Sequence, residues 1–259
     1  MAHPDWLRAL LVCSACRAPW NGEAPCPCGQ ARPDPVQAGL GAEYDGLLDG
    51  ALWKAARDPR RFEAIDAPLL EAAGPTTLEL GCGFGRLLDL LAPRVERLVG
   101  VDLSARSLAV AAGRGHTVLR ADALALPFRA GAFDAVVAGF GVFAHLEPRA
   151  AIAEAARVLA PGGRLAFHTF GRYALDVSRV AGAVVRLRLP PPRTSFHAHA
   201  LRTLAPVDAA LAAAGLWRTH LDCHLHAPGI KRLLRRRPVV HVAALAPWSW
   251  DVVVVAQKG

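Results

Sequence analysis

The chain has 259 residues, and 53% of them are hydrophobic, which is enough to bury one substantial core. Its net charge of +8 comes almost entirely from arginine and keeps nucleic acid among the possible partners. Neither a secretory signal nor a membrane span is predicted, because the N-terminus has no basic segment before a long apolar run, and polar residues and Pro247 interrupt the apolar stretch from Val239 to Ala256.

Four of the six cysteines lie in two close pairs near the N-terminus, Cys13 with Cys16 and Cys26 with Cys28. Two such turns can be joined by one tetrahedral Zn²⁺ ion, so residues 1–40 are predicted to form a small zinc-ribbon-like module with four cysteine ligands. The second pair has C-x-C spacing, which is tighter than the usual knuckle, and a ribbon without metal or a redox pair stays open. This uneven layout is no disulfide framework and favours a reducing cytoplasm.

Residues 41–75 are predicted to be helical. Ala42 to Arg57 and Arg60 to Ala73 carry apolar residues at helical spacing, and Asp58-Pro59 separates them.

A glycine-rich turn follows the first predicted strand. Thr77 to Leu80 are expected to form a buried strand, and Gly81, Gly83 and Gly85 precede a helix that begins near Arg86. Glycines allow a sharp turn with little bulk, so that backbone can lie against a ligand. The next apolar run ends in Asp102, about twenty residues past the first glycine, where a carboxylate can accept both hydroxyls of a ribose.

These two motifs alone also suit a dinucleotide site, but three further features argue against one. Glu79 would repel a pyrophosphate, whereas it can meet a cationic amino-acid moiety. The glycines read G-x-G-x-G instead of G-x-G-x-x-G. Downstream, segments around Asp122, Phe133 to Val137 and Arg157 to Leu165 follow at intervals of one helix plus one strand.

The ordered set of motifs resembles the class I S-adenosylmethionine-dependent methyltransferases from about Gly74 to the C-terminus. The resemblance implies a Rossmann-like α/β fold for residues 76–259, with a doubly wound, mostly parallel sheet of seven strands. It implies that residues 41–75 cover the cofactor site, with Tyr44 closing over the methionine unless it is a core residue. The cysteine segment also resembles small zinc ribbons that accompany tRNA and protein methyltransferases or precede the catalytic domain of ribosomal-RNA guanine methyltransferases. This second resemblance rests on fewer residues.

By the main resemblance, the glycines and Glu79 would line the methionine end of the cofactor, Asp102 would hold the ribose, and Asp122 and Ala123 would contact the adenine. The full set of expected cofactor-binding residues is Tyr44, Glu79, Gly81, Cys82, Gly83, Gly85, Asp102, Leu103, Asp122, Ala123 and Gly139. Alternatively, Asp102 and Asp122 only cap the helices that follow them.

The C-terminal part is predicted to carry an insertion and two final strands. Residues 172–204 depart from regular alternation and are interpreted as a substrate-covering insertion. A helix from Leu204 to Ala214 and a strand from Trp217 to His226 follow, and on this strand the alternate residues His220, Asp222, His224 and His226 share one face. Trp250 to Ala256 is expected to close the sheet.

Methyl transfer from a sulfonium is an in-line displacement, for which positioning supplies much of the rate and a general base is optional. His145 is the first candidate base, although packing at a helix start is the more ordinary role for it. The chain lacks the Asn/Asp-Pro-Pro-Tyr/Phe sequence of amino-methylating nucleic-acid enzymes and a cysteine nucleophile near the fourth strand.

The sequence therefore predicts a cytoplasmic methyltransferase, monomeric or homodimeric, that acts on an O, N, S or C atom of a small molecule. Two alternatives stay open: a methyltransferase for bases of rRNA or tRNA, and a cofactor-binding scaffold without activity.

Overall fold

The structure, a computed structural model, describes residues 3–19, 62–139, 142–171, 175–177, 185–187, 201, 203–224, 239–248 and 251–259. Tyr44, Cys26, Cys28 and the predicted helix from Ala42 to Arg57 lie outside these ranges.

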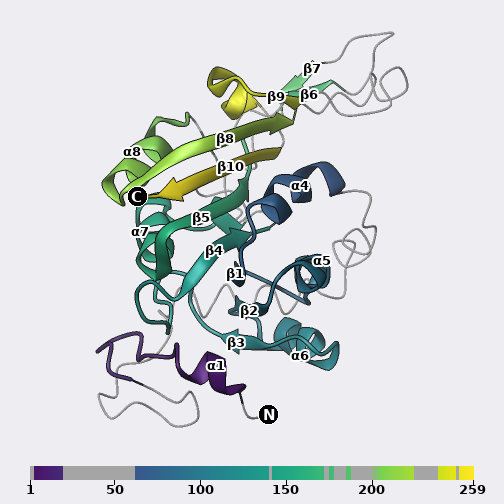
Figure 1. Ribbon diagram of the computed structural model, residues 1–259. Helices are drawn as coiled ribbons and strands as arrows, with labels where there is room; N and C mark the ends of the chain where they lie inside the picture. The colour runs from purple at the N-terminus through teal and green to yellow at the C-terminus, as the bar shows by residue number, and fades with distance from the viewer. Residues whose placement is uncertain are drawn as a thin grey trace.

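The centre of the fold is a twisted sheet with the strand order β3-β2-β1-β4-β5-β10-β8-β9 (Figure 1). Neighbouring strands among the first five are parallel, whereas β10 is antiparallel to β5 and β8, and β9 is antiparallel to β8. The strands are β1 (Thr76–Leu80), β2 (Arg97–Asp102), β3 (Val118–Arg120), β4 (Phe133–Ala138), β5 (Leu159–Thr169), β8 (Leu216–His224), β9 (Val239–Val240) and β10 (Asp251–Lys258). The predicted mostly parallel sheet of seven strands is confirmed, and β9 adds a two-residue strand at the edge.

Helices cover both faces of this sheet (Figure 1). On one face lie α4 (Glu63–Glu71), α5 (Arg86–Leu91) and α6 (Ala105–Gly113), and on the other lie α7 (Pro148–Val158) and α8 (Ala205–Ala213). Because both faces are covered, the strands are apolar without strict alternation, and the four valines from Val252 to Val255 are all buried. The helix predicted from Arg60 is α4, and that predicted from Leu204 is α8.

The N-terminal segment packs on this body. It contains the short helix α1 (Asp5–Arg8), and Leu7, Leu10 and Leu11 are buried in the main hydrophobic core. Backbone hydrogen bonds continue the contact: the Arg129 amide donates to the Leu10 carbonyl and the Val12 amide to the Pro127 carbonyl.

Two short strands lie within the predicted insertion. β6 (Leu175–Val177) and β7 (Val185–Leu187) pair with each other in antiparallel fashion and form a sheet separate from the main one. Whether this region covers a substrate stays a prediction.

Among the helices that the structure describes, none combines the length and the apolar character needed to cross a bilayer.

Candidate functional site

The carboxyl ends of the central parallel strands bring the predicted site residues to one edge of the sheet. β1 ends at Leu80, β2 at Asp102 and β4 at Ala138, so the glycine turn, Asp102 and Gly139 follow neighbouring strand ends. Ligands of open parallel sheets bind at this edge.

The three glycines of the turn between β1 and α5 all have positive φ, with values of 63° at Gly81, 51° at Gly83 and 89° at Gly85. Side chains other than glycine are strained in this region. A Cβ at Gly81 would also collide with Cγ2 of Val142, whereas a Cβ at Gly83 would meet nothing within 4 Å. Gly81 is thus required by packing, and Gly83 faces open space that a ligand can use.

Glu79 is the second-last residue of β1, and its exposed fraction is only 2%. Burial raises the pKa of its carboxyl well above the ordinary value of 4.5, although the guanidinium of Arg86 opposes that rise. Its Oε2 atom is buried and accepts no hydrogen bond. A buried carboxylate oxygen without a partner is costly, and a cation placed beside it would remove that cost.

Arg86 does not supply this cation because another carboxylate holds it. Its two terminal nitrogens donate to the two carboxylate oxygens of Asp66 on α4 at 2.5 and 2.8 Å, and its guanidinium lies 4.8 Å from the ring centre of Phe62. The sequence analysis missed this cluster. A signal was present, since Phe62 and Asp66 are four residues apart at the start of a predicted helix and Arg86 directly follows the glycines.

Asp102 ties the end of β2 to the glycine turn. Its Oδ2 accepts a hydrogen bond from the Gly83 amide and its Oδ1 one from the Ser104 amide, both at 2.8 Å. The N-cap of α6 is Ser104, whose Oγ accepts from the Ser107 amide. The alternative in which Asp102 caps the following helix therefore does not hold. The neighbouring Leu103 is partly buried, and its carbonyl accepts a bond from Arg120.

Asp122 follows β3 and is 6% exposed. Its carboxylate accepts a hydrogen bond from the Leu124 amide at 2.8 Å, and a turn, not a helix, follows it. Asp122 is thus no helix cap either. Ala123 is partly buried against the main core.

Cys82 and Gly139 border the same site. Burial and the nearby Glu79 carboxylate raise the pKa of the Cys82 thiol well above its usual value, which disfavours the nucleophilic thiolate form. A Cβ at Gly139 would lie 3.2 Å from Cδ2 of Leu87, a tight contact, and 3.9 Å from Oε1 of Glu79, so glycine leaves room at this position.

His145 follows the 3₁₀ turn η3 (Val142–Ala144) and is partly exposed. Its amide donates to the Val142 carbonyl, and its neighbour Phe143 stacks on Phe167 with ring centres 4.0 Å apart. This packing holds the segment after β4, and a role of His145 as general base stays a prediction.

The first cysteine pair forms a tight turn. The Cys16 amide donates to Sγ of Cys13 at 3.5 Å, and Arg17 after it has a φ of 61°. Cys13 is buried and Cys16 exposed. The Arg17 side chain then donates to the Leu126 carbonyl at 2.9 Å and so holds the turn on the body.

The glycine turn yields a prediction about stability. Gly81→Ala is expected to lower the free energy of unfolding by more than Gly83→Ala, for which we expect only the ~1–2 kcal/mol of a left-handed alanine. Urea unfolding of both variants measures this. Adding Val142→Ala should recover part of the loss in Gly81→Ala, because it removes the colliding methyl group, and should not help Gly83→Ala. Equal losses of unfolding free energy in the two single variants would contradict the packing of Gly81 against Val142.

Glu79 yields a prediction about pH. Because its pKa is raised on folding, the folded state holds a proton that the unfolded state releases, so Glu79 reduces stability progressively as pH rises above about 4.5. Glu79→Gln should therefore be more stable than the unchanged protein at about pH 8, by roughly 1–3 kcal/mol, and the gap should close toward pH 5. Thermal unfolding at both pH values tests this, with the exposed Glu96→Gln as the control. A gap independent of pH would refute it.

Comparison with known proteins agrees with this geometry. Residues 78–167 match the methyltransferase domain family. The chain is 43% identical over 134 residues to a demethylmenaquinone methyltransferase of Thermus thermophilus, covering 49% of this chain and 60% of that protein. It is 40% identical over 105 residues to a 2-phytyl-1,4-naphtoquinone methyltransferase of Thermosynechococcus vestitus, covering 38% of this chain and 47% of that protein.

The chain thus spans only about half of these relatives' length. A solved structure of geranyl diphosphate C-methyltransferase from Streptomyces coelicolor, in complex with Mg²⁺, geranyl diphosphate and S-adenosyl-L-homocysteine, shares the fold with a TM-score of 0.60. Its identity is 19%, over 88% of this chain and all of that one. The domain match and these relatives thus make residues 78–167 similar to a methyltransferase domain, within a fold that the geranyl diphosphate C-methyltransferase shares.

Proposed function

We propose that this protein transfers the methyl group of S-adenosylmethionine to a small-molecule acceptor. The observation that carries the proposal is the buried Glu79 carboxylate, whose Oε2 accepts no hydrogen bond beside a glycine turn with open space at Gly83. This combination suits a ligand that carries a positive charge next to Glu79 and packs closely against the backbone of the glycine turn.

The residues at the sheet edge fit the parts of this cofactor. Glu79 would neutralise the ammonium of the methionine moiety, and Gly83 would leave room for the chain of that moiety. The carboxylate of Asp102 accepts the Gly83 and Ser104 amides, and it would accept the ribose hydroxyls of the cofactor. Asp122 and Ala123, after β3, would lie at the adenine.

Bound there, the cofactor supplies a methyl group on a positively charged sulfur. The protein holds this group and the acceptor in line and excludes water, which accounts for much of the rate of such a displacement. His145 follows the strand end next to β1, and we propose it as the residue that takes a proton from the acceptor where one must leave.

For the acceptor we propose a reduced quinone ring. Two relatives with at least 40% identity over their matched parts carry names of naphthoquinone-type methyltransferases. An RNA base is the second candidate, which the net charge of +8 and the cysteine turn docked on the body favour.

We further propose that Cys13, Cys16, Cys26 and Cys28 bind one Zn²⁺ ion. The amide-to-sulfur bond inside the first pair and the positive φ of Arg17 support this, because a thiolate held in a tight turn is suited to a metal. We also propose that the protein is a cytoplasmic monomer or homodimer. The free state of Cys13, Cys16, Cys82 and Cys223 supports the reducing compartment.

The test of function is methyl transfer from tritiated S-adenosylmethionine to a reduced demethylated naphthoquinone, with total RNA in a parallel reaction. We expect label in the quinone fraction. Calorimetry should show cofactor binding that Asp102→Asn weakens by at least roughly tenfold, the value of a lost bond to a charged group, while Glu96→Gln binds normally. Label in RNA alone would favour the second candidate. Cofactor binding without label in either fraction would favour a cofactor-binding scaffold without activity. Absence of cofactor binding would refute the cofactor site proposed here.

The zinc proposal is tested by metal analysis of protein purified without added metal and dialysed against a weak chelator. We expect about one zinc per chain. Cys16→Ser and Cys26→Ser should each lose it, because a four-ligand site becomes incomplete, while Cys223→Ala, in the core, should keep it. Unchanged zinc in both serine variants would exclude the module as its site.

A further inference from the structure

A second polar cluster lies far from β1, near the edge of the sheet that β9 forms. Its residues are on β8 and directly after β9. His220 and Asp222 are alternate residues of β8 and therefore share a face. β9 pairs with β8 so that Val240 lies opposite Cys223, and one further step places His241 opposite Asp222. Two imidazoles thus flank one carboxylate.

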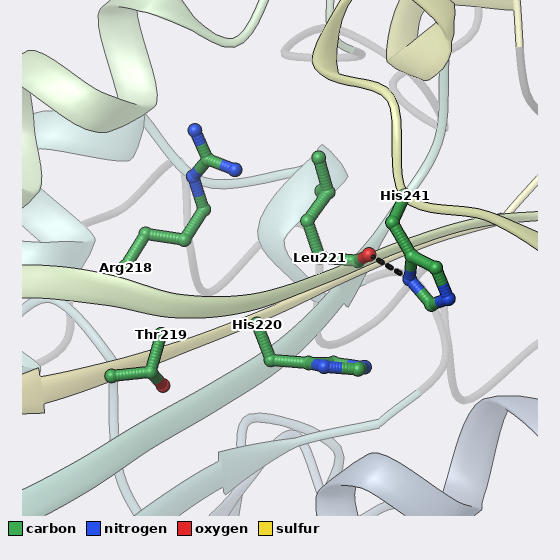
Figure 2. A pocket seen from close by; sticks show the side chains of 5 residues that line it. All are labelled: Arg218, Thr219, His220, Leu221 and His241. Atoms are coloured by element: carbon green, nitrogen blue, oxygen red, sulfur yellow. Dashed lines mark hydrogen bonds between the residues drawn. The ribbon is translucent and has the colours of Figure 1, made fainter.

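The distances within this cluster are those of groups around a common centre. Oδ1 of Asp222 lies 2.9 Å from Nε2 of His220 and 2.9 Å from Nδ1 of His241. One ring nitrogen of each histidine and a carboxylate oxygen lie within 4.8 Å of one another. Figure 2 shows both imidazoles on the wall of a pocket that Arg218, Thr219 and Leu221 also line. The cluster is therefore open to a ligand from solvent.

Asp222 is the buried member, at 7% exposure, and its Oδ1 accepts no hydrogen bond. The two imidazole nitrogens are near enough for a bond but are not aligned with this oxygen. A buried, unsatisfied carboxylate oxygen between two such rings is the arrangement that a bound cation completes.

His241 is also held as a metal ligand usually is. Its Nδ1 lies 2.8 Å from the Leu221 carbonyl oxygen, the dashed contact in Figure 2. A proton on Nδ1 that is donated to this carbonyl leaves Nε2 with its lone pair. Metal-binding histidines are typically oriented by such a bond from the other ring nitrogen.

The charge around the cluster permits a cation. Arg218 lines the same pocket, but its guanidinium is paired with Asp208, with Nε 2.8 Å from Oδ1. Its charge is therefore largely neutralised and does not oppose a second cation beside Asp222.

We propose that His220, Asp222 and His241 bind a divalent transition-metal ion of the zinc class. Two imidazoles and one carboxylate suit Zn²⁺, Co²⁺ or Ni²⁺, whereas Mg²⁺ and Ca²⁺ prefer oxygen ligands alone. β8 is four strands from β1 in the sheet, roughly 19 Å away at ordinary strand spacing. The ion would thus take no part in methyl transfer and would tie the residue after β9 to β8. This site does not depend on the proposed function.

The test is calorimetric titration of untagged protein with Co²⁺. Zinc is first added to fill the four-cysteine site, and dialysis against a chelator then removes it from the cluster, which has only three protein ligands. We expect one further equivalent of Co²⁺ to bind. His220→Ala, His241→Ala and Asp222→Asn should each weaken that binding at least tenfold. His116→Gln, which changes a histidine outside the cluster, should not.

The absorption spectrum identifies the ligands independently. Cobalt on imidazole and carboxylate lacks the intense charge-transfer band that thiolate ligands give, so the added equivalent should increase only the weak visible bands. His220 and His241 have 43% and 66% exposed side chains, so their replacement should leave the melting temperature without metal unchanged. Absence of the further equivalent, or undiminished binding in both histidine variants, would overturn the proposal, as would the thiolate band.

Discussion

Three of the five residues between Leu80 and Arg86 have a positive φ, and the carboxyl edge of the sheet depends on this short stretch of backbone. The chain leaves a buried strand and enters a helix through five residues, of which Gly81, Gly83 and Gly85 carry no side chain. Gly81 lets Val142 pack directly on the turn, which positions the segment after β4. The Gly83 amide is directed to Asp102, which joins the turn to β2. Gly81 and Gly83 therefore leave room for a ligand and also connect the turn to β2 and to the segment after β4.

The electrostatics around Glu79 depend on which carboxylate holds the guanidinium of Arg86. Asp66 binds Arg86 through both oxygens, and Phe62 lies against the guanidinium, so that Arg86 is fixed on α4 and does not pair with Glu79. Glu79 then stays buried with a raised pKa. Removing one partner of a buried ion pair is strongly destabilising. The helix before the first strand thus influences the pocket through charge, even though it contributes no residue to the turn.

The sequence was informative where function depends on the ends of regular elements. Glu79, the glycines, Asp102 and Gly139 come together as predicted because parallel strands all present their carboxyl ends at one edge. The pairing of Asp66 with Arg86 was not predicted, since the two residues are twenty positions apart and meet only through the way α4 packs on the sheet. β9 has two residues, too few for any periodicity, so the meeting of His241 with Asp222 had no sequence signal. Tyr44 and the second cysteine pair lie outside the described residues, and their roles stay predictions.

The position of β10 has a consequence for the order in which the fold is assembled. This strand follows all the other described strands in the sequence, yet it lies between β5 and β8 in the sheet and is antiparallel to both. During synthesis, β1 to β5 can pair as they emerge, but β8 has no neighbour linking it to them until residues 251–258 have left the ribosome. Lys258 then also donates to the carbonyls of Ala156 and Leu159 at the end of α7. The nascent chain therefore holds an open, apolar edge at β5 until β10 has been synthesised, which exposes this edge to mispairing with another chain.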